Sequence, residues 1–205
     1  MKKNTSEQIK SVSRLKKAGN ILAKQVKKPD VPAIDLSGVT ALDQKNLIKV
    51  IVETSKGSRN KYKYDASSGL FEHLFTLKWG LTFPFNYGFI PSTMAEDGDP
   101  LDVVILMEEP VLTGCLIRTR VIGILEVEQI KGNTTVRNDR IIAVHPPCET
   151  YGDINSFGQL SQARIDAVEE FFKTYLSTRH IKFAPLGWLN STIALEKLAE
   201  KIVEF

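Results

Sequence analysis

The candidate chemistry in this sequence centres on a seven-residue stretch, EDGDPLD (96–102), which carries four acidic side chains. Asp97, Asp99 and Asp102 are spaced by two and three residues, and Gly98 between the first two permits a tight turn. A plain Asp-Gly turn explains Asp97. It does not explain two further aspartates at the entry to an apolar strand, where an unpaired carboxylate is costly. A bound cation accounts for all three acids.

An EF-hand calcium loop is one alternative, because Glu108 stands eleven residues after Asp97. That pattern fails because Leu101 fills the fifth position of the loop and Asp102 fills the sixth, where a glycine is needed. A short rigid turn suits Mg²⁺ better, since this ion takes one or two carboxylates, keeps waters and shares phosphate oxygens. The sequence therefore predicts a Mg²⁺ site at Asp97, Asp99 and Asp102.

Basic side chains that could hold a phosphate occur together in KGSRNKYKY (56–64). On its own, a basic hairpin of this kind is usually only a solvated face. Together with a carboxylate cluster in the same small domain, it indicates a combined metal and phosphate site. The cations of this stretch are Lys56, Arg59, Lys61 and Lys63.

The elements that must position these residues begin with a run of short strands. LIKVIVET (47–54) is rich in β-forming residues, and SSGLFEHLFTL (67–77) is typical of a turn followed by a strand. LDVVILM (101–107) is nearly all apolar, which indicates a strand buried on both faces. IKGNTTVRND (130–139) supplies a turn before a further short strand, RIIAVH (140–145).

Beyond these strands the hydrophobic period becomes helical. In QLSQARIDAVEEFFKTYL (159–176) the apolar residues mark one helical face. A second helix is expected over STIALEKLAEKIVEF (191–205), with Asn190 or Ser191 as its cap. Many short strands followed by helices predict an α+β fold, a small β-barrel with helices packed outside it.

The whole chain has 205 residues, 42% of them hydrophobic and 25% charged, as expected for one globular domain plus appendages. Its net charge of +3 is unevenly distributed. Residues 1–30 hold nine Lys or Arg against two acids, which leaves a charge of −4 for residues 31–205. We therefore expect a basic N-terminal extension over residues 1–40, containing a weakly amphipathic helix, and a barrel domain with its helices over residues 41–205.

The sequence also predicts a cytoplasmic protein. No apolar run approaches membrane-spanning length, and no apolar region follows the N-terminal lysines as it does in a secretory signal. Cys115 and Cys148 lie beside apolar or proline-rich sequence, which favours buried free thiols in a reducing cytosol. A nucleic-acid binder with a basic arm is disfavoured by the acidic body and by the lack of exposed aromatic pairs, so we expect neither nucleic-acid nor membrane partners.

FNYGFIPSTMAEDGDPLDVVIL (85–106) closely resembles the signature of family I soluble inorganic pyrophosphatases, in which D-x-D-x-x-D follows an N-Y-G-[FY]-I-P strand. VETSKGSRNKYKYDASSGL (52–70) resembles the hairpin that precedes it. The resemblance implies an OB-type five-stranded β-barrel with flanking helices, whose open end binds several Mg²⁺ ions and pyrophosphate. It also implies a homo-oligomer that hydrolyses pyrophosphate to two phosphates with a metal-activated water.

The resemblance assigns roles by position. Asp97 and Asp102 match metal ligands, and Asp99 matches the carboxylate that orients or deprotonates the nucleophile. Glu53 matches an acid that supports the metal-bound waters, and Arg140 lies where a lysine is usual. The residues that match substrate-binding positions are Lys61, Tyr87, Arg140 and Tyr175.

Several positions depart from the family pattern, which predicts reduced or altered activity. The wall opposite the aspartates has lost up to three carboxylates and two phosphate-binding cations. An insertion near Asn138 leaves Asp139 or Glu128 as alternative ligands in its place. The departing residues are Lys63, Phe75, Phe83, Gln129, Asn138 and Leu176.

Two functional hypotheses follow from this mixture of retained and lost residues. The leading one is a Mg²⁺-dependent inorganic pyrophosphatase, because the aspartate turn is complete. The alternative is a degenerate family member that binds a phosphorylated ligand or a partner protein without turnover, because the departures occur together. Phosphate release from pyrophosphate distinguishes the two.

Overall fold

The computed structural model describes residues 35–203 apart from residues 37 and 46. The helix expected in the basic extension lies outside the described residues, and the domain boundary at residue 40 stays a prediction. In chain order the described elements are β1 (Ile48–Thr54), β2 (Asn60–Asp65), β3 (Leu70–Thr76), β4 (Asn86–Phe89), β5 (Asp102–Leu106), β6 (Leu116–Lys131), β7 (Thr134–Arg137), β8 (Arg140–Val144), the 3-10 helix η1 (Phe157–Gln159), α2 (Gln162–Ser177), β9 (Lys182–Asn190) and α3 (Ser191–Glu200).

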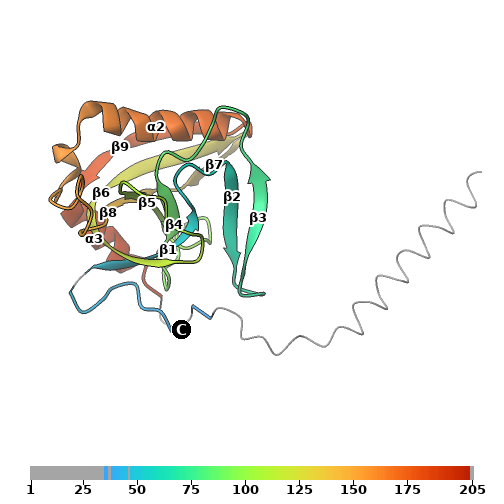
Figure 1. The fold of residues 1–205 in the computed structure, drawn as a ribbon. Coiled ribbons are helices and arrows are strands. Elements are labelled where there is room, and N and C mark those ends of the chain that lie inside the picture. Colours follow the sequence, from blue (N-terminus) through green and yellow to red (C-terminus); the bar gives the residue numbers. More distant parts are fainter. Residues whose placement is uncertain (1–34, 37, 46, 204–205) are drawn as a thin grey trace, which may run out of the picture. The chain divides into compact units, whose positions relative to one another are not determined.

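Five strands close into a barrel in the order β1, β4, β5, β8 and β6, because β6 pairs back with β1. The pairing of β5 with β8 is parallel, and the other four pairings are antiparallel. Strands β7 and β9 pair with β6, while β2 and β3 form a separate hairpin beside the barrel (Figure 1). The predicted α+β fold with a five-stranded barrel is confirmed.

Alternate residues of the barrel strands contribute to two hydrophobic cores. In β5, Val103 and Ile105 belong to one core, Val104 and Leu106 belong to the other, and all four side chains are buried. This strand is therefore buried on both faces, as its apolar sequence predicts. Helix α3 contributes to the core of Val103, and α2 contributes to the core of Val104.

Helix α2 packs beside β9, and in Figure 1 it runs along the top of the barrel. Its predicted apolar face is confirmed, since Val168, Phe171, Phe172 and Tyr175 are all buried. This aromatic face packs against the core that contains Val104, and it also contributes to the cavity. Among the described residues, no helix combines the length and apolarity that crossing a membrane requires.

Helix α3 is shorter than the sequence predicts. Its cap is Asn190, one of the two expected, and the Asn190 side chain accepts a hydrogen bond from the Ile193 N–H at 3.0 Å. The helix ends at Glu200, so the prediction of a helix through residue 205 is wrong. Ile202 instead forms an isolated β-bridge with Thr93, because the chain turns to pair beside the acidic loop.

Strand β9 has no counterpart among the predicted elements. Its sequence, KFAPLGWLN, contains Pro185 and Gly187, which ordinarily mark a turn. Both residues lie at a register shift in the pairing with β6, opposite Glu126 and Val127. An irregular ladder tolerates a proline without an N–H and a glycine without a side chain, so β9 continues through them.

The two cysteines are free thiols, but they are not both buried as predicted. Cys115 is exposed and Cys148 is half-buried. Each lies in a turn: the Cys115 N–H donates to the Leu112 carbonyl at 3.2 Å, and the Cys148 N–H donates to the His145 carbonyl at 3.0 Å. Apolar neighbours in the sequence therefore do not bury a residue that the backbone places in a surface turn.

Gly88 allows β4 to approach β1 closely. It lies opposite Val52 of β1 in the antiparallel register. A Cβ atom added at Gly88 would lie 2.0 Å from the carbonyl oxygen of Ile51, and this backbone atom cannot move without opening the pairing. The glycine of the N-Y-G motif is therefore required for the closed barrel.

Replacing Gly88 with alanine is expected to lower the free energy of unfolding by about 3 kcal/mol or more, because the added methyl group forces β1 and β4 apart. Gly158→Ala is the matched control, since a Cβ there meets nothing nearer than the Ser156 Oγ at 3.8 Å. Urea unfolding followed by circular dichroism measures both variants. Equal unfolding midpoints would contradict the role given to Gly88.

Candidate active site

A cavity of about 300 Å³ lies between the barrel, the β2–β3 hairpin and α2. It gathers side chains from elements that are far apart in the sequence. A larger, more open hollow of about 1180 Å³ beside Asp43 and Arg118 contains none of the predicted site residues. Seven of the eight predicted site residues line the smaller cavity: Glu53, Lys61, Tyr87, Asp99, Asp102, Arg140 and Tyr175.

The acidic turn is organised by its own backbone. The Ala95 N–H donates to the Asp99 carbonyl at 2.7 Å, and Gly98 has a φ of +84°, which favours glycine. Asp97 is the predicted residue that does not line the cavity. One of its oxygens accepts the Asp99 N–H at 3.1 Å, and the other accepts the Asn138 side-chain amide at 2.9 Å. The turn role that the Asp-Gly sequence predicts for Asp97 is therefore part of what this side chain does.

Glu53 is buried and held by two donors. Its Oε2 lies 2.7 Å from the Lys61 Nζ, and its Oε1 accepts the Tyr64 N–H at 2.9 Å. The Glu53 and Lys61 side chains are only 8% and 12% exposed, so this ion pair is largely desolvated. The Lys61 Nζ also lies 4.5 Å from the centre of the Tyr87 ring. Burial, reinforced by the nearby Asp102 charge, raises the pKa of Tyr87 well above its ordinary value, so its hydroxyl stays protonated.

Asp99 forms a second ion pair, which is open to solvent. Its Oδ1 lies 2.6 Å from the Lys63 Nζ, and the two side chains are 51% and 43% exposed. Partial burial opposes the charge of Lys63, but the hydrogen bond and the charge of Asp99 prevail and raise the pKa of Lys63. Lys63 is therefore a permanent cation at the carboxylate predicted to act on the nucleophile.

The parallel pairing of β5 with β8 places Asp102 directly opposite Arg140. Arg140 is only 2% exposed, its guanidinium carbon lies 4.2 Å from the centre of the Phe172 ring, and its Nη1 donates to the Asn138 carbonyl at 2.6 Å. Its Nε finds no hydrogen-bond partner among the described residues. Desolvation raises the pKa of Asp102, although the charges of Arg140 and Lys61 oppose that rise.

Comparisons with known proteins identify the family of this chain. The sequence model of a family described as “Inorganic pyrophosphatase” matches residues 50–205. An inorganic pyrophosphatase of Synechocystis sp. is 34% identical over 172 residues, which cover 84% of this chain and 99% of that protein. The chain belongs to the inorganic pyrophosphatase family.

Two further relatives show how far this family likeness extends. Soluble inorganic pyrophosphatase 3 of Arabidopsis thaliana is 38% identical over 152 residues, which cover 74% of this chain and 68% of that protein. The crystal structure of the inorganic pyrophosphatase from Thermus thermophilus aligns with a TM-score of 0.74 at 31% identity, covering 82% of this chain and 97% of that chain. The likeness therefore spans the barrel and its helices rather than a local motif.

Membership in the inorganic pyrophosphatase family implies a divalent metal cofactor. Within the described part of the chain, no three or more His, Cys, Asp or Glu side chains converge as a ready metal cluster. Glu53, Asp99 and Asp102 nevertheless line one cavity, and all three present carboxylate oxygens. This donor set fits a hard divalent cation that takes one or two carboxylates and completes its shell with water.

The substituted family positions have new partners in this structure. Lys63 and Asn138 bind the acids Asp99 and Asp97, as described above. Phe75 stacks on Tyr175 with ring centres 6.1 Å apart and an interplanar angle of 19°, and Leu176 is 2% exposed in the core. Where the resemblance predicts cations, at Phe75 and Leu176, the structure has packing, and where it predicts carboxylates, at Lys63 and Asn138, it has donors to Asp99 and Asp97.

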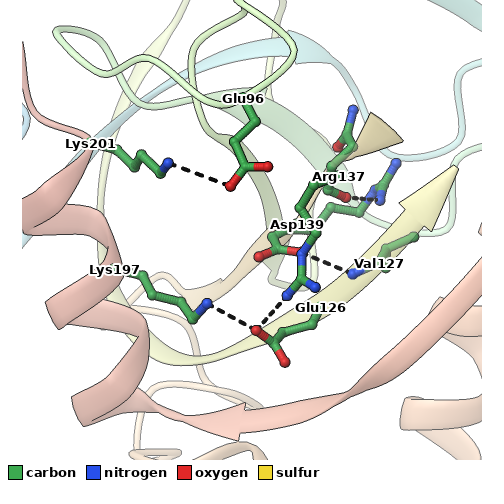
Figure 2. A network of polar contacts seen from close by, with 9 residues as sticks. Glu96, Glu126, Val127, Arg137, Asp139, Lys197 and Lys201 are labelled. Atoms are coloured by element: carbon green, nitrogen blue, oxygen red, sulfur yellow. Dashed lines mark hydrogen bonds and ion pairs between the residues drawn. The ribbon is translucent and has the colours of Figure 1, made fainter. Parts of the chain in front are cut away.

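The two acids that the sequence offers in place of Asn138 do not line the cavity. Asp139 accepts hydrogen bonds from the Val127 N–H at 2.9 Å and from the Arg137 Nε at 2.5 Å. Figure 2 shows Arg137 also reaching Glu126, which Lys197 of α3 approaches to 2.9 Å. The charge of Asp139 is thus balanced by Arg137, within a network of ion pairs that links β7 to α3 through Glu126.

Glu128 and Glu96 lie in the same charged region, away from the cavity. Both line a separate hollow together with Asp139. Glu96 is exposed and lies 3.7 Å from the Lys201 Nζ (Figure 2). The fourth acid of the turn, Glu96, therefore faces solvent, and Glu128 does not line the cavity in place of Asn138.

Two of the four cations predicted to hold phosphate serve the fold instead. The Lys56 Nζ donates to the Glu108 carbonyl at 2.6 Å. The Arg59 Nη2 donates to the Leu77 carbonyl at 2.6 Å, and its guanidinium lies 4.3 Å from the centre of the Trp79 ring. Lys61 and Lys63 face the cavity because they lie on the strand β2 rather than in the loop before it.

Among the charged residues that line the cavity, sequence reasoning missed one, Arg179, which follows the end of α2. The signal available was its spacing, since Arg179 stands four residues after Tyr175, a predicted substrate-binding residue. A cation so close in the chain to Tyr175, just beyond the end of the helix, can reach the same region.

The two lysine–carboxylate pairs are expected to differ in their contribution to stability. Lys61→Met leaves the buried Glu53 without its counter-charge, which should lower the free energy of unfolding by about 3 kcal/mol. Lys63→Met is the matched control on the same strand. It breaks an exposed pair and should cost less than about 1 kcal/mol. Urea unfolding of both variants measures the difference, and a larger loss for Lys63→Met would contradict the burial argument.

Proposed function

We propose that this protein hydrolyses inorganic pyrophosphate to two phosphates, with Mg²⁺ as its divalent metal. The observation that carries the proposal is the meeting of Asp99, Asp102 and Glu53 with the cations Lys61 and Arg140 in one cavity of an inorganic pyrophosphatase fold. Metal-assisted phosphoryl transfer requires carboxylates that hold the cation. It also requires hydrogen-bond donors that hold the phosphate oxygens. The proposed compartment is the cytoplasm, and the proposed assembly is a homo-oligomer.

The residues proposed to hold the metal are Asp97 and Asp102, with Asp99 and Glu53 binding it or its waters. When bound, Mg²⁺ lowers the pKa of a coordinated water and neutralises charge on the phosphoryl oxygens. Asp97 becomes available when the Asn138 amide releases it, and Asp102 is already desolvated beside Arg140. A cation held by these two residues would replace the hydrogen bond from Asn138 to Asp97 and would add to the positive charges of Arg140 and Lys61 near Asp102.

The remaining residues supply proton transfer and positioning. Asp99 accepts the proton of the attacking water at its carboxylate, after that carboxylate exchanges its contact with Lys63. Lys61 and Arg140 attract the anionic substrate into the cavity and hold its phosphate oxygens. The hydroxyl groups of Tyr87 and Tyr175 donate hydrogen bonds to the departing phosphate. The raised pKa of Tyr87 keeps its hydroxyl protonated.

Asp99→Asn tests the proposed proton acceptor. The amide keeps the shape but cannot take the proton, so kcat for pyrophosphate hydrolysis should fall by about 100-fold or more. Glu96→Gln is the control, because it neutralises an exposed acid of the same turn that lies outside the cavity. Phosphate release with and without Mg²⁺ measures both. An inactive natural protein would support the binding-only alternative, and equal losses in both variants would remove the role of Asp99.

Lys63→Glu tests how the ion pair with Asp99 affects metal binding. The change removes a cation 2.6 Å from the Asp99 carboxylate and adds a ligand, so Mn²⁺ should bind about tenfold tighter in the absence of substrate. Lys78→Glu makes the same charge change at an exposed position that does not line the cavity. Titration calorimetry measures both affinities. Similar gains in the two variants would assign the effect to net charge alone.

A further inference from the structure

Arg179 differs from the other cations that line the cavity. Lys61 pairs with Glu53, Lys63 pairs with Asp99, and Arg140 is buried with a donor on a backbone carbonyl. Arg179 is exposed, and among the described residues its side chain has no ion pair. Among the described residues that line the cavity, it is therefore the exposed cation that has no ion pair with a carboxylate.

The position of the Arg179 guanidinium is set by an aromatic platform. Its carbon lies 4.7 Å from the centre of the Phe75 ring. Phe75 stacks on Tyr175, and Tyr175 in turn stacks on Phe171 with ring centres 5.7 Å apart and an interplanar angle of 1°. Because Tyr175 and Phe171 are buried, the outer ring is anchored in the core. Contact with the ring restrains the position of the guanidinium without occupying its N–H donors in conventional hydrogen bonds.

We propose that Arg179 is a substrate-binding residue, which donates to phosphate oxygens at the mouth of the cavity from its platform on Phe75. This inference rests on the proposed function, since the ligand is the pyrophosphate anion. A guanidinium fits the task because its parallel N–H groups match two oxygens of one phosphate. Phe75 acts as a positioning residue for Arg179 and does not touch the substrate.

A purely structural role does not explain this arrangement, as a second arginine shows. The Arg164 guanidinium carbon lies 4.4 Å from the centre of the Tyr151 ring, so it stacks in the same way. Arg164 belongs to α2 but does not line the cavity. Both arginines therefore contact an aromatic ring, but of the two only Arg179 also lines the cavity. Arg164 provides a matched control.

The test measures substrate binding and turnover for Arg179→Met against Arg164→Met. Charge-assisted hydrogen bonds to phosphate predict that Arg179→Met weakens calorimetric binding of methylenediphosphonate, a non-hydrolysable analogue, by about tenfold or more in the presence of Mg²⁺. KM for pyrophosphate should rise by a similar factor. Arg179→Lys should be intermediate, because it keeps the charge but loses the planar fork. Arg164→Met should change neither quantity by more than about twofold.

Phe75→Leu separates the platform from the charge. This change keeps Arg179 but removes the ring that restrains it, so analogue binding should weaken in Phe75→Leu and should weaken no further in the double variant with Arg179→Met. Urea unfolding midpoints of all variants establish that binding changes do not arise from unfolding. Independent, additive losses would overturn the positioning role of Phe75.

The outcomes separate this inference from the proposed function. One outcome is that the natural protein hydrolyses pyrophosphate and that the Arg179→Met variant binds the analogue as tightly as the natural protein does. In that case the inference is overturned and the proposed function stands. If the natural protein binds the analogue through Arg179 but releases no phosphate, the binding role stands and the hydrolytic function is lost. If Arg164→Met and Arg179→Met weaken binding equally, the effect is one of general charge and the inference fails.

Discussion

The parallel pairing of β5 with β8 is the interaction on which the site depends. It places Asp102, at the end of the acidic turn, opposite Arg140, and it brings Asn138 to 2.9 Å from Asp97. Parallel strands cannot be joined by a tight turn, so the chain between them must make a long excursion. Here that excursion is β6 with its hairpin to β7. The strand that closes the barrel against β1 is thus also the one that allows the acids and cations to meet.

The two ion pairs at the site have different physical consequences. Glu53 and Lys61 are desolvated, so removing either charge leaves the other buried and unpaired, and the pair acts as a fixed part of the wall. Asp99 and Lys63 are about half exposed, so their attraction is screened and either group can exchange its partner for an incoming ligand. The carboxylate proposed to accept the proton, Asp99, is therefore in an exposed ion pair, and the neighbouring Glu53 is in a buried one. Arg179 differs from both pairs, because contact with the Phe75 ring restrains its position without neutralising its charge.

The sequence predicts the barrel and most of the cavity residues. Its predictions fail where a residue's role depends on a contact with a residue far away in the chain. Hydrophobic alternation and the apolar run at 101–107 predict the strands, and seven of eight predicted residues line one cavity. Strand β9 was missed because Pro185 and Gly187 disfavour a regular ladder, whereas an irregular pairing with β6 accommodates them. Lys56 and Arg59 were assigned to phosphate because their charges are visible in the sequence, but the carbonyls that engage them are not.

The sequence by itself determined the identity and spacing of the acids, and with them the metal and phosphate chemistry and the family. A turn such as 97–102 is set by neighbouring residues, because Gly98 supplies the positive φ and Asp97 caps the Asp99 N–H. The tertiary structure alone decided which charge each acid meets. Lys63 at Asp99, Asn138 at Asp97 and Arg179 on Phe75 all depend on distances across strands and helices. Hydrogen bonds, ion-pair contacts and ring contacts need their partner atoms within a few ångströms, so strand register and helix position decide them rather than separation along the chain.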